Sequence, residues 1–192
     1  EDSAFLDFSK VNYTKAKAGF FISYHAYPYY PDFVGNDPNY INENDYLGQN
    51  SYLGYLKDLK SHYASTPLII AEYGVPSSWG IAHYTSNGMY HGGYDEKTQG
   101  EINARLLENN FAADCGGGMV FSWIDEWFKR TWITDPMDFN VERRVLWHNV
   151  TSPEQNFGLI GYKKANSSFK TIEEFCSNCP IKSIEGETDF AY

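Results

Sequence analysis

The pattern of apolar and polar positions along the chain predicts three strand–helix units. Apolar runs at 19–24, 67–71 and 119–123 are short and begin at or follow Gly or Pro, as expected for strands of a buried sheet. Between them, apolar residues repeat at helical spacing over 52–63 and 98–111. A strand followed by a helix, repeated three times, predicts a parallel sheet with right-handed crossovers.

The connections between these elements differ in length. Long loops follow the strands and run to about residues 50, 97 and 155, whereas the connections after the helices are short. The long loops therefore lie at the carboxyl ends of the strands, the face on which parallel α/β proteins bind ligands. A capping box at Thr98 and Glu101 predicts the start of the second helix. The sequence also indicates a short strand over 157–162 and a closing helix over 168–175.

Length and charge restrict the class of protein. The 192 residues suffice for a single domain, 1–192, with its own core. The net charge of -10 argues against a nucleic-acid partner, whose phosphates attract Lys and Arg. No apolar run approaches the roughly 20 residues that a membrane span needs. Because the first residues, 1–3, do not form a charged-then-apolar leader, we expect any signal peptide to have been removed or to lie upstream.

Aromatic residues are abundant and are not confined to the apolar runs. The chain has 16 Tyr, 13 Phe and 5 Trp, many of them among Pro, Gly, Asn and Asp. Rings on loops suit flat, partly apolar ligands such as sugars. The alternative is that these aromatic side chains simply surround the core.

The cysteines do not predict a metal site. Cys176 and Cys179 form a C-x-x-C pair, and Cys115 alone does not complete a zinc site. We expect a local disulfide or two free thiols, and we expect neither a metal nor a cofactor. A competing hypothesis, an open α/β domain with a redox C-x-x-C, predicts that this pair lies near the carboxyl-end face of the sheet.

Glu72 ends the second apolar run, directly before Tyr73 and Gly74. A carboxylate at the end of a buried strand is about to leave the core, and in barrels of alternating strands and helices catalytic groups occupy such strand ends. The alternative is a structural carboxylate paired with a cation, but buried carboxylates are rare without a partner or a task.

Three motifs in order carry a resemblance to a known family. A strand followed by His25-x-Tyr27-Pro, then Ile-Ile-Ala-Glu72-Tyr-Gly, then Phe-Ser-Trp123, resembles retaining glycoside hydrolases of clan A, the beta-galactosidase and cellulase superfamily. The resemblance covers about residues 19 to 175. It implies a partial (β/α)8 TIM barrel consisting of the C-terminal strands six to eight with their helices.

The resemblance also implies a role for each matching residue. Glu72 would be the nucleophile that forms a glycosyl ester, Tyr27 would donate a hydrogen bond to it, and His25 would contact the sugar or the same carboxylate. Trp123 would form the floor under the sugar ring. Candidates for binding sugar hydroxyls and for outer subsites are Asp125, Glu126, Trp127, Trp79, Tyr84, Tyr90 and Trp132.

Each of these residues also has a purely structural interpretation. His25 could be a core or capping histidine, and Tyr27 a turn aromatic. Trp123 could pack the barrel mouth rather than touch sugar. Asp125 and Glu126 could be a solvated acidic pair.

The family's second catalytic carboxyl, a Glu after Asn at the end of the fourth strand, has no match at the required place. Asn42-Glu43 has the right dipeptide but follows Tyr27, so we do not assign it. We therefore expect a C-terminal portion of a longer barrel that needs its N-terminal half, or self-association, and that is inactive alone. The expected partner is an oligo- or polysaccharide, and the expected location is extracellular or periplasmic. The alternative function is a non-catalytic carbohydrate-binding or scaffold half-barrel.

Overall fold

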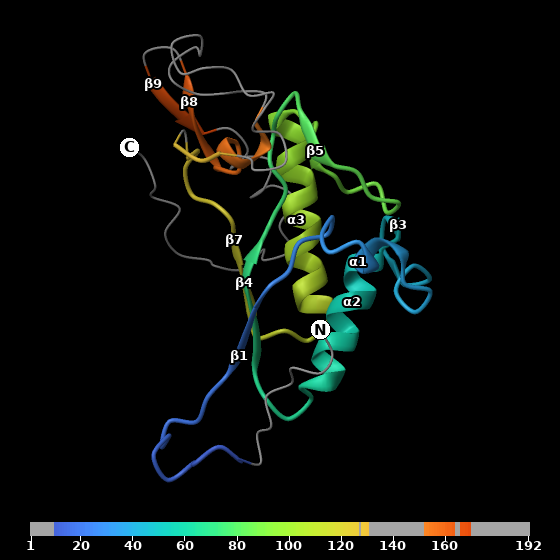
Figure 1. The fold of residues 1–192 in the computed structure, drawn as a ribbon, viewed down its shortest axis with the longest axis vertical. Helices are drawn as coiled ribbons and strands as arrows, with labels where there is room; N and C mark the ends of the chain where they lie inside the picture. The colour runs from blue at the N-terminus through green and yellow to red at the C-terminus, as the bar shows by residue number, and fades with distance from the viewer. Residues whose placement is uncertain (1–9, 127, 131–151, 164–165, 170–192) are drawn as a thin grey trace.

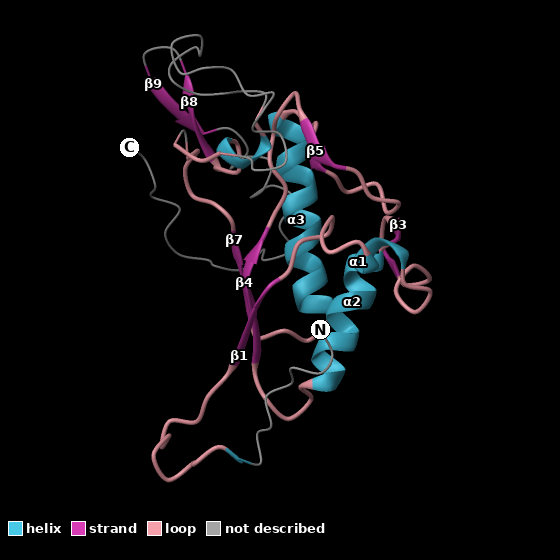
Figure 2. Ribbon diagram, viewed as in Figure 1, coloured by secondary structure: helices cyan, strands magenta, loops and turns pink. Residues whose placement is uncertain are grey.

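The computed structural model shows a mixed α/β fold built on a three-stranded parallel sheet (Figures 1 and 2). It describes residues 10–126, 128–130, 152–163 and 166–169. The strands of the sheet are β1 (Ile22–His25), β4 (Leu68–Tyr73) and β7 (Gly117–Val120). They run parallel in the order β1-β4-β7, which confirms the predicted succession of neighbouring parallel strands.

Three helices accompany the sheet, namely α1 (Phe33–Asn36), α2 (Ser51–His62) and α3 (Glu96–Ala112). The Asn50 side chain caps α2 by accepting a hydrogen bond from the Leu53 amide. The start predicted for α3 at Thr98 is wrong by two residues, because the Asp95 carboxylate accepts a hydrogen bond from the Thr98 amide and begins the helix earlier.

The loops contain short elements that periodicity did not reveal. Two small hairpins, β2–β3 and β5–β6, lie in the first two long loops, and a 3-10 turn, η6, precedes a third hairpin, β8–β9, whose first strand overlaps the short strand indicated over 157–162. Ser168 and Phe169 belong to a strand rather than to the predicted closing helix, whose remainder lies outside the described residues. The bounds of these elements are β2 (Asn44–Asp45), β3 (Gly48–Gln49), β5 (Ile81–His83), β6 (His91–Gly92), η6 (Pro153–Gln155), β8 (Ile160–Lys163) and β9 (Asn166–Phe169).

The core lies between the sheet and the helices α2 and α3, which run side by side along one face of the sheet (Figure 1). Leu68 and Ile70 of β4 are fully buried, as are Leu56 of α2 and Leu106 of α3. Ile69, between the two buried β4 residues, is only partly buried. The β4 run is therefore half-buried in the described structure, not buried on both faces as its apolar composition predicted.

The other face of the sheet is less covered. The side chains of Phe21 and Met119, next to β1 and in β7, are 59% and 60% exposed. No closed barrel is present in the part of the chain that the structure describes, and a partial TIM barrel is not established by this three-stranded sheet. The same part of the chain contains no helix with the length and apolarity that crossing a membrane requires.

A buried polar clamp fixes the β2–β3 hairpin to α3. Arg105 donates to both carboxylate oxygens of Asp45, with Nε–Oδ2 and Nη2–Oδ1 distances of 2.6 and 2.9 Å. Asn50 and Asn109 donate to Oδ2 at 2.5 and 3.2 Å. Burial alone would raise the pKa of Asp45, but these hydrogen bonds outweigh it and lower the pKa to about 2. The clamp holds the loop that follows β1 against the helix layer.

Candidate functional site

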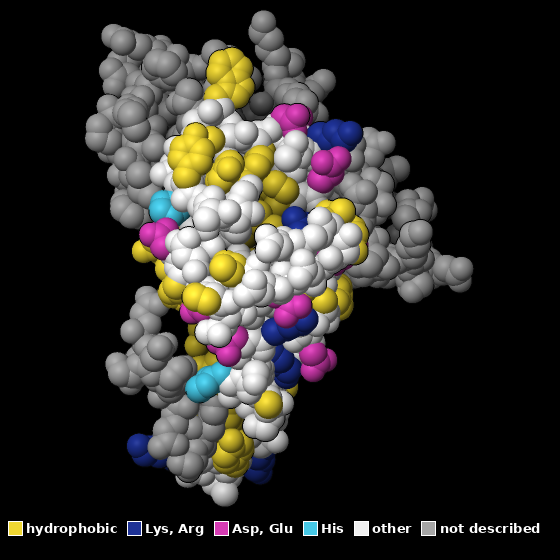
Figure 3. Space-filling model, turned by 90° about the vertical axis from the view of Figure 1, so that its right-hand side faces the viewer, with side chains coloured by type: hydrophobic (Ala, Val, Ile, Leu, Met, Phe, Trp, Pro, Cys, Tyr) yellow, Lys and Arg dark blue, Asp and Glu magenta, His cyan; other side chains and the backbone are white. Residues whose placement is uncertain are grey.

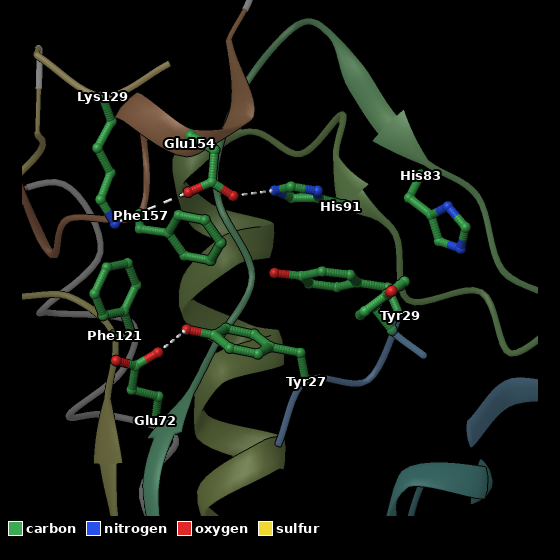
Figure 4. Close-up of a pocket in the computed structure, with 10 residues that line it drawn as sticks. Tyr27, Tyr29, Glu72, His83, His91, Phe121, Lys129, Glu154 and Phe157 are labelled. Carbon is green, nitrogen blue, oxygen red and sulfur yellow. Dashed lines mark hydrogen bonds and ion pairs between the residues drawn. The ribbon is translucent and has the colours of Figure 1, made fainter. Parts of the chain in front are cut away.

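A cavity of about 310 Å³ lies at the carboxyl ends of β1 and β4 (Figure 4). Its volume is at the lower end of the range for small-molecule sites. The β5–β6 hairpin and the η6 turn lie at the same end of the molecule, so the long loops do gather on this face (Figure 1). The lining residues are Tyr27, Tyr29, Tyr30, Glu72, His83, His91, Phe121, Lys129, Glu154 and Phe157.

Glu72 lines the cavity, and its hydrogen bond and its ion pair both fall on one carboxylate oxygen, Oε2. Oε2 accepts a hydrogen bond from the Tyr27 hydroxyl at 2.8 Å and lies 3.2 Å from Nδ1 of His25. Among the residues that the structure describes, none forms a hydrogen bond or ion pair with Oε1. The sheet register creates this arrangement, because His25 pairs directly with Glu72 across β1 and β4. Tyr27 follows two residues later, in a tight turn closed by Tyr30.

The surroundings of Tyr27 keep its hydroxyl protonated as a hydrogen-bond donor to Glu72. Burial is the main reason that the pKa of its phenol is raised far above the usual value, and the hydrogen bond to Glu72 raises it further. The hydroxyl therefore keeps its proton at neutral pH. His25 differs, because its side chain is 60% exposed and it is not part of the cavity wall.

Aromatic rings form much of the rest of the wall. Tyr29 stacks flat on His91, with ring centroids 4.7 Å apart and an angle of 2° between the planes. Phe157 lies edge-on to Phe121 at 5.2 Å and to Tyr27 at 6.0 Å. Packed rings with a few polar groups between them present both apolar surface and hydrogen-bonding positions to a ligand.

Four polar residues of the wall were missed by sequence reasoning: Glu154, His91, Lys129 and His83. Nε2 of His91 lies 3.0 Å from Oε1 of Glu154, and Nζ of Lys129 lies 3.9 Å from Oε2. Figure 4 shows that Glu154 and Glu72 enter the pocket from different elements, η6 and β4. The only available signal was the position of these residues in the long loops after the strands.

The other predicted sugar-binding residues do not line this cavity. Trp123 and Trp79 are 61% and 86% exposed. Asp125 is buried, and its Oδ1 accepts a hydrogen bond from the Gly158 amide at 2.9 Å, which ties β7 to the segment before β8. Glu126 lies 2.9 Å from Lys129 through Oε2. Trp127, Trp132, Cys176 and Cys179 lie outside the described residues.

Exposed aromatic side chains also occur on the loops around the cavity. Tyr84 is 67% exposed and packs edge-on against Tyr90, with ring centroids 5.0 Å apart. Tyr30 is 58% exposed and packs edge-on against His83, a residue of the cavity wall. On the face drawn in Figure 3, hydrophobic side chains gather in the upper part, and acidic and basic side chains lie both beside them and below. The surface near the cavity therefore offers rings to a longer ligand.

Within the described ranges, no group of three or more His, Cys, Asp or Glu side chains is arranged to hold a metal ion. Comparison of the chain with protein-family models, with curated proteins and with solved structures finds no match. The chemistry of the site therefore has to be inferred from its own residues: an oriented carboxylate at a strand end, facing a cavity with aromatic walls.

Proposed function

We propose that the cavity binds a sugar ring and that Glu72 is the nucleophile of a retaining glycoside hydrolase. The observation that carries the proposal is the Glu72 carboxylate, which lines an aromatic cavity and is oriented by the Tyr27 hydroxyl through Oε2. We further propose that the sheet represents strands six to eight of a TIM barrel. The parallel order of the strands and the gathering of long loops at their carboxyl ends support this assignment.

The proposed reaction begins with attack of a Glu72 oxygen on the anomeric carbon. The bond from that carbon to the leaving group breaks, and its electron pair departs with the leaving group while a glycosyl ester forms on Glu72. Water then hydrolyses the ester. Tyr27 acts as a positioning residue, because its hydrogen bond fixes the carboxylate without accepting or releasing a proton.

We place the acid/base carboxyl outside the described residues, on an N-terminal barrel half or on another copy of the chain. In the described sheet, β1 and β7 are edge strands with one neighbour each, and Phe21 and Met119 are exposed beside them. Such edges and apolar side chains are usually covered. The chain alone is therefore expected to hydrolyse unactivated glycosides at no useful rate.

A covalent trap tests Glu72 independently of the acid/base residue. Glycosyl fluorides with a second fluorine next to the anomeric carbon need no protonation of the leaving group, and their esters hydrolyse slowly. After incubation with gluco-, galacto- and manno-configured compounds, mass spectrometry should find one added fluorosugar, and peptide mapping should place it on Glu72. The variant Glu72→Gln should remain unlabelled.

The variant Glu101→Gln is a matched control, because Glu101 lies on α3 in an exposed pair with Lys97. It should be labelled like the wild type. Absence of labelling with every compound, or labelling that persists in Glu72→Gln, would contradict the assignment of the nucleophile. Turnover by the wild type of an alkyl glycoside, whose leaving group needs protonation, abolished by Glu72→Gln, would instead show that the acid/base carboxyl is present in this chain.

The second candidate function is a non-catalytic carbohydrate-binding unit. It is favoured by the highly exposed rings of Trp79 and Tyr84, which can bind sugar without any chemistry. Sugar binding without labelling of Glu72 would support this alternative. For either function we propose an oligo- or polysaccharide ligand and an extracellular or periplasmic location, in keeping with the acidic charge and the many aromatic residues.

A further inference from the structure

The cavity has a second carboxylate, Glu154, on the wall opposite the strand ends. Glu154 belongs to the η6 turn, and Figure 4 shows its carboxylate reaching into the pocket from the side away from Glu72. The rings of Phe157 and Tyr27 lie between the two acidic groups in this view. A ligand in the cavity would therefore meet one carboxylate on each side and aromatic surface between them.

Glu154 is held in a fixed position. Its Oε1 lies 3.0 Å from Nε2 of His91, and His91 is itself 6% exposed and stacked on Tyr29. Its Oε2 faces the ammonium group of Lys129. Both oxygens thus face nitrogens, and each carboxylate oxygen has room to accept a further hydrogen bond from a ligand. We do not assign Glu154 as the missing acid.

The charge of the cavity is negative. Its wall carries Glu72 and Glu154 against the single ammonium group of Lys129 among the described residues. Lys129 is also shared with Glu126, which lies closer to Nζ than Glu154 does, at 2.9 Å against 3.9 Å. The ammonium group is therefore largely compensated before any ligand enters, and an anionic ligand would gain little from it.

We infer that Glu154 is a ligand-binding carboxylate that restricts the cavity to neutral or amino sugars and excludes uronic acids. Carboxylates accept hydrogen bonds from sugar hydroxyls and attract an ammonium group, whereas a sugar carboxylate between Glu72 and Glu154 meets like charges on both sides. This specificity rests on the proposed sugar site. It assigns a role to a residue on the part of the cavity wall that the loops form, away from β1 and β4.

The test measures binding of three ligand classes to the purified protein by titration calorimetry. The probes are neutral methyl glycosides, the corresponding hexosamines and the corresponding uronates, each in gluco and galacto form. In the wild type the neutral and amino sugars should bind at least tenfold more tightly than the uronates, a difference of about 1.4 kcal/mol. In Glu154→Gln this ratio should fall, with weaker hexosamine binding and tighter uronate binding, while Glu101→Gln should leave it unchanged.

The outcomes separate this inference from the proposed function. Uronate binding as tight as that of the neutral sugars in the wild type overturns the inference but leaves a sugar site in place. Unchanged selectivity in a folded Glu154→Gln protein overturns the role of Glu154. Failure of every sugar to bind removes the proposed function and the inference together. Because the wild-type comparison needs no variant, the inference stays falsifiable even if Glu154→Gln does not fold.

Discussion

Asp45 and Glu72 are both carboxylates fixed by hydrogen bonds, but their surroundings differ. The Asp45 side chain is 5% exposed, and Arg105, Asn50 and Asn109 donate to it. The Glu72 side chain is 30% exposed, its hydrogen bond and its ion pair both fall on Oε2, and the residue lines the cavity. The difference separates a carboxylate that is buried among protein donors from one that lines a cavity and can meet a ligand.

The largest expected effect that tests this comparison is the loss of stability when the clamp between Asp45 and Arg105 is removed. Asp45→Ala leaves the guanidinium of Arg105 in a largely buried position without its carboxylate, which should lower the free energy of unfolding by about 3 kcal/mol. Glu72→Gln should change it by less than about 1 kcal/mol, because the side chain is partly exposed and no buried cation loses its partner. Urea denaturation of both variants measures the two values.

Glu43→Ala is the matched control for the clamp. Glu43 lies two residues before Asp45 but pairs with Lys57 at the surface, with a Nζ–Oε1 distance of 2.9 Å. Surface ion pairs contribute about 0–1 kcal/mol, so this variant should stay close to the wild type. Equal destabilisation by Asp45→Ala and Glu72→Gln would remove the distinction between a structural and a functional carboxylate.

Acid should weaken the clamp, because protonation of Asp45 removes the acceptor of its hydrogen bonds. The pKa of Asp45 is about 2 in the folded protein against a usual value of 3.8, so its contribution to stability is present above about pH 4 and is lost as the pH falls toward 2. Urea midpoints measured from pH 5 to pH 2 should fall, and Asp45→Ala should show a smaller fall over this window. An identical fall in the two proteins would show that the clamp does not titrate there.

Two further carboxyl groups contribute to the dependence of stability on acid. The pKa of Glu43 is lowered mainly by its hydrogen bond from Lys57, and the pKa of Asp95 is lowered by its hydrogen bonds from Thr98. Both side chains are close to solvent and less extensively bonded than Asp45, so we expect their parts of the acid dependence to be smaller. Glu43→Ala should therefore retain most of the wild-type fall.

The elements that periodicity predicted are those that place several apolar side chains in the core. Leu68 and Ile70 of β4, and the apolar stripe of α2, gave signals strong enough to place the sheet and its order. The β5–β6 hairpin was not predicted, because its strands have only three and two residues and Ile81 is the single β-branched residue in them.

The residues of the candidate site likewise fall into those that the sequence predicted and those that it missed. Glu72, Tyr27 and His25 sit at or next to strand ends, so a parallel register alone brings them together. Glu154 and His91 meet only because two loops fold back over the strand ends, and loop folding depends on contacts far apart in the sequence. Sequence patterns therefore predicted the strand wall of the cavity and missed the loop wall.

The smallest effect concerns the orientation of Glu72. Tyr27→Phe removes the hydroxyl that holds Oε2 but keeps the ring, so we expect a change in unfolding free energy of about 1 kcal/mol or less and about tenfold slower fluorosugar labelling of Glu72. Tyr24→Phe is the matched control, because it removes a hydroxyl of β1 that is bonded to Tyr63 instead. Labelling rates from timed mass spectra compare the two variants. If Tyr27→Phe labels as fast as Tyr24→Phe, the phenol does not orient the nucleophile, and Glu72 resembles Asp45 in needing its hydrogen bonds only for the fold.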